Sequence, residues 1–210
     1  MNLANQFVKA FEADDKKTIK QLIQKYQKKF PTTCLEAEIQ LLFQGQKFQK
    51  ALSKIEQYEN LVDITQMPTG SMLVFAQILL SEKKAKRALK YLKRVIVLDP
   101  KSRTAPELMF WLFFNESDYG NADMVLTKLI SVDPEEKQYL VWKLILRAQE
   151  EKFADVLSLF ELIRPIYNHE MHRFDEVTHG VFHAFLYLKS PNDLKELVSE
   201  YQIFQNKSLN

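Results

Sequence analysis

All four histidines of the chain lie close together, and their spacing is suited to metal chemistry. They are His169, His172, His179 and His183. On a helix, the last three and Glu176 share one face, so they could offer ring nitrogens and a carboxylate to zinc. No His-Glu-x-x-His motif or cysteine pair accompanies them, and histidines at the surface or in the core are the alternative that we favour. We therefore expect no resident metal.

A run of basic residues could bind a polyanion. Seven positive charges without one acid fall within twelve residues: Lys83, Lys84, Lys86, Arg87, Lys90, Lys93 and Arg94. Apolar residues alternate with them, so the charges lie on the solvent side of an amphipathic helix. Nucleic acid or an anionic membrane surface would be the matching partner. A solvated convex face is the alternative that we favour, because no recognised nucleic-acid module accompanies the charge.

Residues suited to catalysis are few. The paired carboxylates at 14–15, 135–136 and 150–151 are sequence neighbours, which point about 100° apart on a helix and fit helix starts better than an acid–base pair. The sequence has no P-loop, no G-x-S-x-G and no glycine fingerprint. Cys34, the one cysteine, is interpreted as a small core residue. We expect neither an enzyme nor a cofactor.

The composition indicates a folded, mostly helical protein. Of 210 residues, 46% are hydrophobic and 27% are charged, which excludes disorder as the main state. Only 4 glycines and 7 prolines disfavour turn-rich β folds and glycine-rich phosphate-binding folds. The net charge of +2 hides a split, since residues 1–105 carry 19 basic and 10 acidic residues and residues 106–210 carry 10 and 17. This asymmetry could attract an anionic partner or align copies head to tail.

Targeting signals are not evident. The first residues carry several charges and lack the apolar stretch of a secretory signal. The longest apolar run, 108–114, is far shorter than the ~18 to 20 residues of a membrane span. A single cysteine is usual for a reducing compartment, so we expect a cytoplasmic protein without a membrane span.

A pattern recurs with a period of 34 residues. Asp99-Pro100 is followed by Asp133-Pro134, and the same interval separates each residue of the first pattern from its counterpart in the second. The first pattern is Met72-x-x-Phe75-Ala76-x-x-Leu79 with Ala88, Leu92 and Pro100. The second is Pro106-x-x-Met109-Phe110-x-x-Phe113 with Ala122, Leu126 and Pro134. In period and pattern the chain resembles the tetratricopeptide repeat family.

The resemblance implies an all-α fold, a right-handed α-solenoid of about six stacked antiparallel helix pairs. The clearest repeats are 69–102 and 103–136, and divergent pairs cover 1–34, 35–68, 137–170 and 171–206. Because one pair cannot bury its apolar stripe alone, we expect a single repeat domain over residues 1–210 with one continuous core. Large residues such as Phe7, Ile39 and Phe110 stand where the family prefers a small one, so the repeats are degenerate.

The resemblance also locates a candidate site, because the first helix of each pair lines a concave groove in this family. The corresponding residues are Leu73, Gln77 and Leu80 in one pair, Glu107, Trp111 and Phe114 in the next, and Val141 and Ile145 in the third. Most are apolar, so we expect the groove to bind a hydrophobic peptide or amphipathic helix, with Gln77 and Glu107 as orienting polar contacts. The predicted function is a non-enzymatic scaffold, adaptor or chaperone.

Other occupants of this groove stay open. The chain's own last helix, predicted over 191–204, or a second copy in a homodimer would also cover it. Family members that bind acidic C-terminal tails clamp the carboxylates with Lys, Asn and Arg, and such a clamp is absent at Leu73, Gln77 and Glu107. The groove is more similar to that of bacterial tetratricopeptide chaperones, which shelter hydrophobic segments of secreted proteins.

Overall fold

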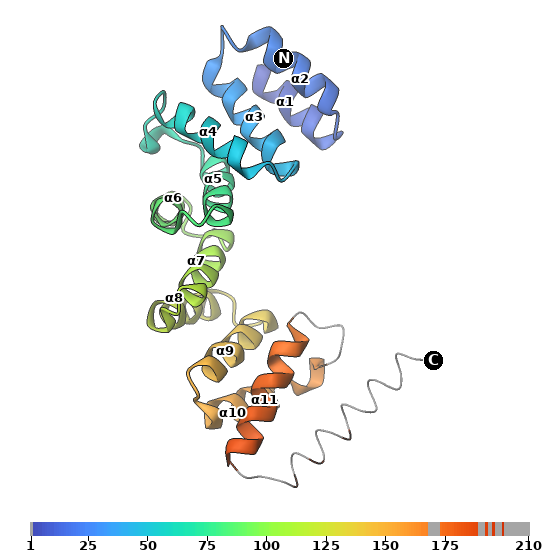
Figure 1. Cartoon of the computed structure of the whole chain (residues 1–210), viewed down its shortest axis with the longest axis vertical. Helices are drawn as coiled ribbons and strands as arrows, with labels where there is room; N and C mark the ends of the chain where they lie inside the picture. The colour runs from blue at the N-terminus through green and yellow to red at the C-terminus, as the bar shows by residue number, and fades with distance from the viewer. Residues whose placement is uncertain (1, 168–172, 189–191, 193–194, 196–198, 200–210) are drawn as a thin grey trace, which may run out of the picture. The chain divides into compact units, whose positions relative to one another are not determined.

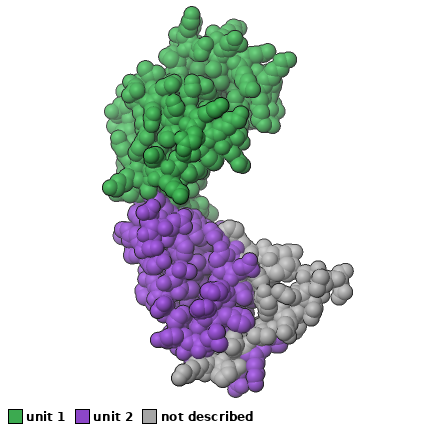
Figure 2. All heavy atoms as spheres, viewed as in Figure 1, with its two compact units in different colours: residues 1–108 green, residues 109–210 purple. Residues whose placement is uncertain are grey.

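A computed structural model describes residues 2–167 and 173–188, together with Asn192, Lys195 and Ser199. Over these residues the chain forms α-helices, short 3-10 helices and loops, without strands, and successive helices run as antiparallel pairs (Figure 1). The all-α repeat architecture expected from the sequence is thereby confirmed. Two compact units, residues 1–108 and 109–210, make up the chain (Figure 2). A single continuous domain stays a prediction.

Unit 1 contains three complete helix pairs. Its elements are α1 (Leu3–Glu12), α2 (Lys16–Tyr26), α3 (Pro31–Gln44), α4 (Phe48–Glu59), η1 (Ile64–Gln66), α5 (Thr69–Ser81) and α6 (Ala85–Leu98). The pairs are α1–α2, α3–α4 and α5–α6, and each pair contacts the next through α2–α3 and α4–α5. The first helices also touch, because α3 contacts both α1 and α5. Helix α7 (Thr104–Asn115) begins in unit 1 and ends in unit 2.

Unit 2 continues the same arrangement. It holds the rest of α7, then α8 (Tyr119–Val132), α9 (Lys137–Gln149), α10 (Phe153–Ile163), η2 (Arg164–Ile166) and α11 (Phe174–Leu188). Helix α9 packs against α8 and α10, and α11 packs against both α9 and α10. The second helix of the last predicted pair, 191–204, lies outside the described residues.

The turn inside each helix pair has one recurring backbone geometry. A single residue with positive φ, never a glycine, occupies the turn at Asp14, Gln46, Lys83, Ser117 and Glu151. At Lys83, the Lys84 N–H donates to the Leu79 carbonyl oxygen at 2.7 Å and the Lys83 N–H donates to that of Leu80 at 3.0 Å. The other four turns repeat both bonds, which define a Schellman motif and satisfy the last carbonyls of the first helix.

Three helix pairs lie within three of the predicted repeats. The repeats over 69–102, 103–136 and 137–170 correspond to α5–α6, α7–α8 and α9–α10. The first boundary differs, because the predicted pair 1–34 includes Pro31, whereas Pro31 is the first residue of α3, which belongs to the next pair. Proline is favoured there, since its missing N–H would have no partner inside the helix and its φ is already helical.

The core follows the apolar residues that the repeats align. Phe7, Phe75, Leu92, Phe110 and Phe160 are all less than 5% exposed. In unit 2 one cluster joins buried residues of α8, α9, α10 and α11 with Phe110 of α7. Cys34 is also buried, as predicted, and burial together with the nearby charge of Glu38 raises the pKa of its thiol. The buried phenylalanines named above therefore serve packing.

Gly180 marks the closest approach of α11 to α9, and it supports a prediction. A Cβ atom added to Gly180 would lie 2.8 Å from the Cβ of Ala148. We expect Gly180→Val to lower the free energy of unfolding by about 2 kcal/mol, because the overpacked helices must move apart. Gly120 is the control, since an added Cβ meets nothing within 4 Å and Gly120→Ala only improves helix propensity. Urea unfolding followed by circular dichroism measures both, and equal stabilities would contradict the prediction.

Candidate functional site

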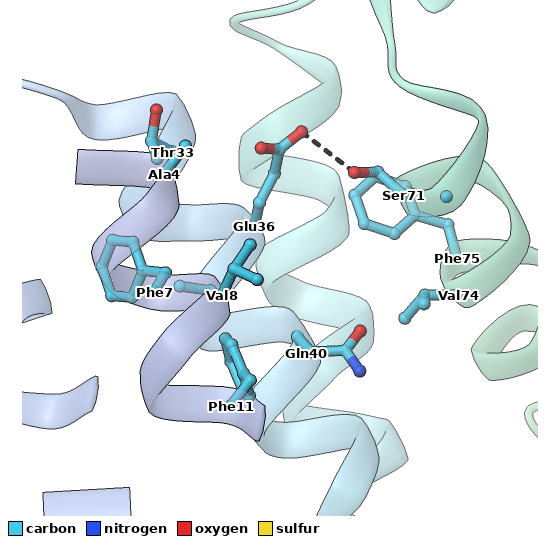
Figure 3. Close-up of a pocket in the computed structure, with 12 residues that line it drawn as sticks. Ala4, Phe7, Val8, Phe11, Thr33, Glu36, Gln40, Ser71, Val74 and Phe75 are labelled. Atoms are coloured by element: carbon cyan, nitrogen blue, oxygen red, sulfur yellow. Dashed lines mark hydrogen bonds between the residues drawn. The ribbon is translucent and has the colours of Figure 1, made fainter. Parts of the chain in front are cut away.

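The first helices of the three pairs in unit 1 enclose an apolar groove. Its volume is about 390 Å³, within the range of ligand-binding pockets. Phe7, Ala37 and Phe75 are buried at its base, while Val8 on α1 is 53% exposed. The full lining is Ala4, Phe7, Val8 and Phe11 from α1, Thr33, Glu36, Ala37 and Gln40 from α3, and Gly70, Ser71, Val74 and Phe75 from α5 (Figure 3). We call this the α1–α3–α5 groove.

Glu36 is the one charged side chain among these lining residues. Its Oε1 accepts a hydrogen bond from the Tyr58 hydroxyl at 2.5 Å and another from the Ser71 hydroxyl at 3.1 Å; the bond to Ser71 spans α3 and α5 (Figure 3). Tyr58 is itself buried, and burial together with the bond to Glu36 raises the pKa of its hydroxyl. The phenol therefore stays protonated at neutral pH and holds the carboxylate of Glu36 in a fixed position.

The predicted groove residues of α5 lie beside this groove. Leu73, Gln77 and Leu80 are half-buried, and none of the three lines it. On the helix they lie roughly 60° to 120° around the axis from Val74 and roughly 120° to 180° from Ser71, both of which line the groove. Glu107, in the first turn of α7, is half-buried as well.

The predicted aromatic anchors of α7 belong to an aromatic cluster in unit 2. The Trp111 ring lies 4.8 Å from that of Phe110 and 5.5 Å from that of Phe114, and both Trp111 and Phe114 are half-buried. The guanidinium of Arg173 covers one face of Trp111 at 4.3 Å from the ring centroid. This cation–π contact occupies a surface that we expected to be available to a partner.

The sequence predicts that Val141 and Ile145 form an exposed stripe on α9, but in the structure both side chains are buried. They are 2% and 4% exposed and belong to the core of unit 2. Buried residues of α11, among them Val177 and Val181, belong to the same cluster, and Gly180 lets the two helices approach closely. In this structure, therefore, the two side chains serve packing within unit 2.

The basic run of 83–94 covers the outer side of α6. Five of its lysines are exposed, at 83, 84, 86, 90 and 93. Arg87 faces acidic residues of α4, with Nη2 2.7 Å from Glu59 and Nη1 3.5 Å from Glu56. Hydrogen bonds from Thr65 lower the pKa of Asp63, and the charges of Lys90 and Arg94 add to this shift. Part of the basic face is thus balanced by acids within unit 1.

Two of the four histidines lie at a second pocket, in unit 2. His169 and His172 fall outside the described residues. The rings of His179 and His183 on α11 are 4.3 Å apart at a pocket of about 500 Å³, which Glu151, Asp175 and Glu176 also line. Glu176 accepts a charged hydrogen bond from Arg173 at 2.7 Å. In the described part of the chain, no three His, Cys, Asp or Glu side chains are grouped to hold a metal ion.

Sequence reasoning missed the α1 and α3 side of the groove. The pattern Leu3-x-x-Gln6-Phe7-x-x-Ala10 identifies the packing stripe of α1, and Val8 and Phe11 follow Phe7 and Ala10 by one position. That offset is the signal that could have identified them, but the clearest repeats begin only at residue 69. In the described residues, none of the helices has both the length and the apolar character needed to cross a bilayer.

Comparisons with known proteins agree on the fold. No family model matches the chain, and no curated protein matches it in sequence. Among solved structures, pilF of Pseudomonas aeruginosa is similar with a TM-score of 0.66 and 11% identity, covering 98% of this chain and 96% of pilF. BtubC from P. vanneervenii is similar with a TM-score of 0.65 and 9% identity, covering 100% of this chain and 93% of BtubC. A tetratricopeptide repeat protein of Parabacteroides merdae is similar with a TM-score of 0.54 and 13% identity, covering 96% of this chain and 77% of that protein. The chain thus has the fold of a tetratricopeptide-like helical repeat protein.

Proposed function

We propose that the chain is a non-enzymatic scaffold, of the adaptor or chaperone kind, which takes a short apolar segment of a partner protein into the α1–α3–α5 groove. The observation that supports this most is the groove itself, about 390 Å³ in volume, with a buried aromatic base and a half-exposed Val8. Apolar segments gain affinity by filling such a pocket with a few anchoring side chains. The fold shared with tetratricopeptide structures is compatible with this use.

Two valines of unit 1 provide a matched test. Val8 lines the groove and is 53% exposed, whereas Val97, near the end of α6, is 68% exposed and does not line it. A selection from a library of short random peptides should enrich apolar sequences. We expect Val8→Gln to weaken binding of the selected peptides at least about tenfold, which corresponds to 1.4 kcal/mol, because a polar amide then enters the apolar groove. Val97→Gln should leave the affinity unchanged.

The outcome also separates other sites and occupants. Peptides that bind Val8→Gln as tightly as the wild type would contradict the groove. If the selected peptides are instead acidic, and their affinity falls steeply with added salt, the basic face of α6 is the binding surface. Sedimentation of the protein alone over a range of concentrations detects a second copy as the occupant. In that case Val8→Gln would dissociate the oligomer.

A further inference from the structure

We propose that the segment bound in the α1–α3–α5 groove carries a lysine or arginine whose cation pairs with Glu36, among apolar side chains that fill the rest of the groove. This inference rests on the proposed function and adds the charge of the partner to it. The partner is thus an apolar segment with one basic residue, and not an acidic tail.

The hydrogen bonds of Glu36 leave one carboxylate oxygen available. Both bonds that Glu36 accepts, from Tyr58 and from Ser71, end on Oε1. A carboxylate has about four acceptor positions, so Oε2 can accept donors from a ligand. Tyr58 on α4 and Ser71 on α5 fix the side chain from two helices, so little conformational entropy is lost when a cation arrives.

The surroundings of Glu36 favour a cation. The other eleven lining residues are uncharged. Two other acids of unit 1 already have cationic partners, since Glu38 lies 3.1 Å from Lys54 and Glu59 lies 2.7 Å from Arg87. No ion pair within the described residues involves Glu36. An unpaired carboxylate at an apolar groove loses hydration when a ligand covers it, and a cation on the ligand offsets that loss. An uncharged segment leaves the cost in place, and an acidic segment adds repulsion.

The charge of Glu36 stands out against the rest of its half of the chain. Residues 1–105 carry nine more basic than acidic residues, which would repel a cationic ligand at long range. Selection of a basic residue therefore depends on the short-range contact with Glu36, and the distant lysines contribute little at physiological salt because the Debye length is about 8 Å. For this reason one substitution is enough to test the inference.

The experiment uses capped synthetic peptides, so that no terminal charge contributes. The peptides selected from the library are resynthesised in three forms, with lysine, norleucine or glutamate at one central position and all other residues apolar or small. Fluorescence anisotropy measures their affinity for the full-length wild type, for Glu36→Gln and for Glu38→Gln. Glu36→Gln keeps an oxygen that accepts from Tyr58, so the groove should keep its shape, and circular dichroism checks this. Glu38→Gln removes a negative charge from the same helix outside the groove.

We expect the wild type to bind the lysine form at least about tenfold more tightly than the norleucine form, and the glutamate form most weakly. Glu36→Gln should bring the lysine and norleucine forms to within about twofold, while Glu38→Gln keeps the wild-type order. Equal affinity of the two forms for the wild type overturns the inference and leaves the apolar groove intact as a binding site. A lysine preference that survives Glu36→Gln overturns it as well. If no peptide binds, or if self-association alone depends on Val8, the proposed function fails too.

Discussion

Phe75→Ala is expected to lower the free energy of unfolding by about 3 to 5 kcal/mol, the usual loss for a phenylalanine truncated inside a core. Phe75 on α5 is 1% exposed. It lies between two tyrosines, with ring centroids 5.3 Å from Tyr58 of α4 and 5.8 Å from Tyr91 of α6, both at nearly perpendicular angles. Edge-to-face contacts of this kind add to the burial of area. Removal of the ring leaves a cavity between two neighbouring pairs and at the base of the groove.

Phe30 serves as the control for this substitution. It precedes α3, is 39% exposed, and its ring centroid lies 6.3 Å from that of Tyr26. Phe30→Ala should cost roughly 1 kcal/mol or less, since little buried area is lost. Urea unfolding of both variants, followed by far-UV circular dichroism, gives the comparison. Equal losses for the two substitutions would show that Phe75 does not hold the pairs together.

Arg147→Met is expected to lower the free energy of unfolding by about 3 kcal/mol. The side chain of Arg147, on α9, is 11% exposed and joins three successive helices of unit 2. Its Nη2 donates to both carboxylate oxygens of Asp123 at 2.9 Å, its Nη1 donates to Glu150, and its Nε lies 3.6 Å from Asp155. Methionine fills a similar volume but leaves Asp123 partly buried without its partner and leaves Glu150 with Lys152 alone, and loss of one partner is the costly way to break a buried pair.

The same network predicts that the stability of the protein depends on pH in the acid range. Burial alone would raise the pKa of Glu150, but hydrogen bonds from Lys152 and Arg147 outweigh it and hold this pKa below its ordinary value of 4.5. Because the folded form has the lower pKa, its stabilisation is present above pH 4.5 and is lost as the pH falls through the folded value. Thermal unfolding over this range should therefore depend less on pH in Glu150→Gln than in the wild type. Lys16→Met, which removes an exposed pair with Asp14, is the control.

Much of the fold could be predicted because periodic burial determines it. Leu92 and Leu126 stand 34 residues apart, and both are fully buried in the second helix of a pair, so residue type and spacing were enough to predict their burial. The predicted first pair, 1–34, extends past Pro31 because proline is compatible with the end of one helix and with the start of the next. The sequence around it has no second stop signal to separate the two.

The candidate site was harder to predict because it depends on which stripe of each first helix stays uncovered. Val141 and Ile145 have the apolar character of a groove, but α11 shares their cluster and they are buried. Trp111 is covered on one face by Arg173, which is distant in sequence. Conversely, Glu36 gains its role from Tyr58 and Ser71, whose hydroxyls meet it only after α3, α4 and α5 have packed. No local pattern encodes such contacts.

The five turns with positive φ have a consequence for how this protein has evolved. A left-handed backbone costs roughly 1 kcal/mol at most residues, and glycine would avoid this cost, yet lysine, glutamine and glutamate occupy three of these turns. The turns are more than thirty residues apart, so gains from substituting them should add. Glycine at these turns would therefore raise the free energy of unfolding by several kcal/mol in total. Its absence there is expected if natural selection maintains only the stability that function requires. The heat tolerance of the protein could be raised at these turns without altering the groove.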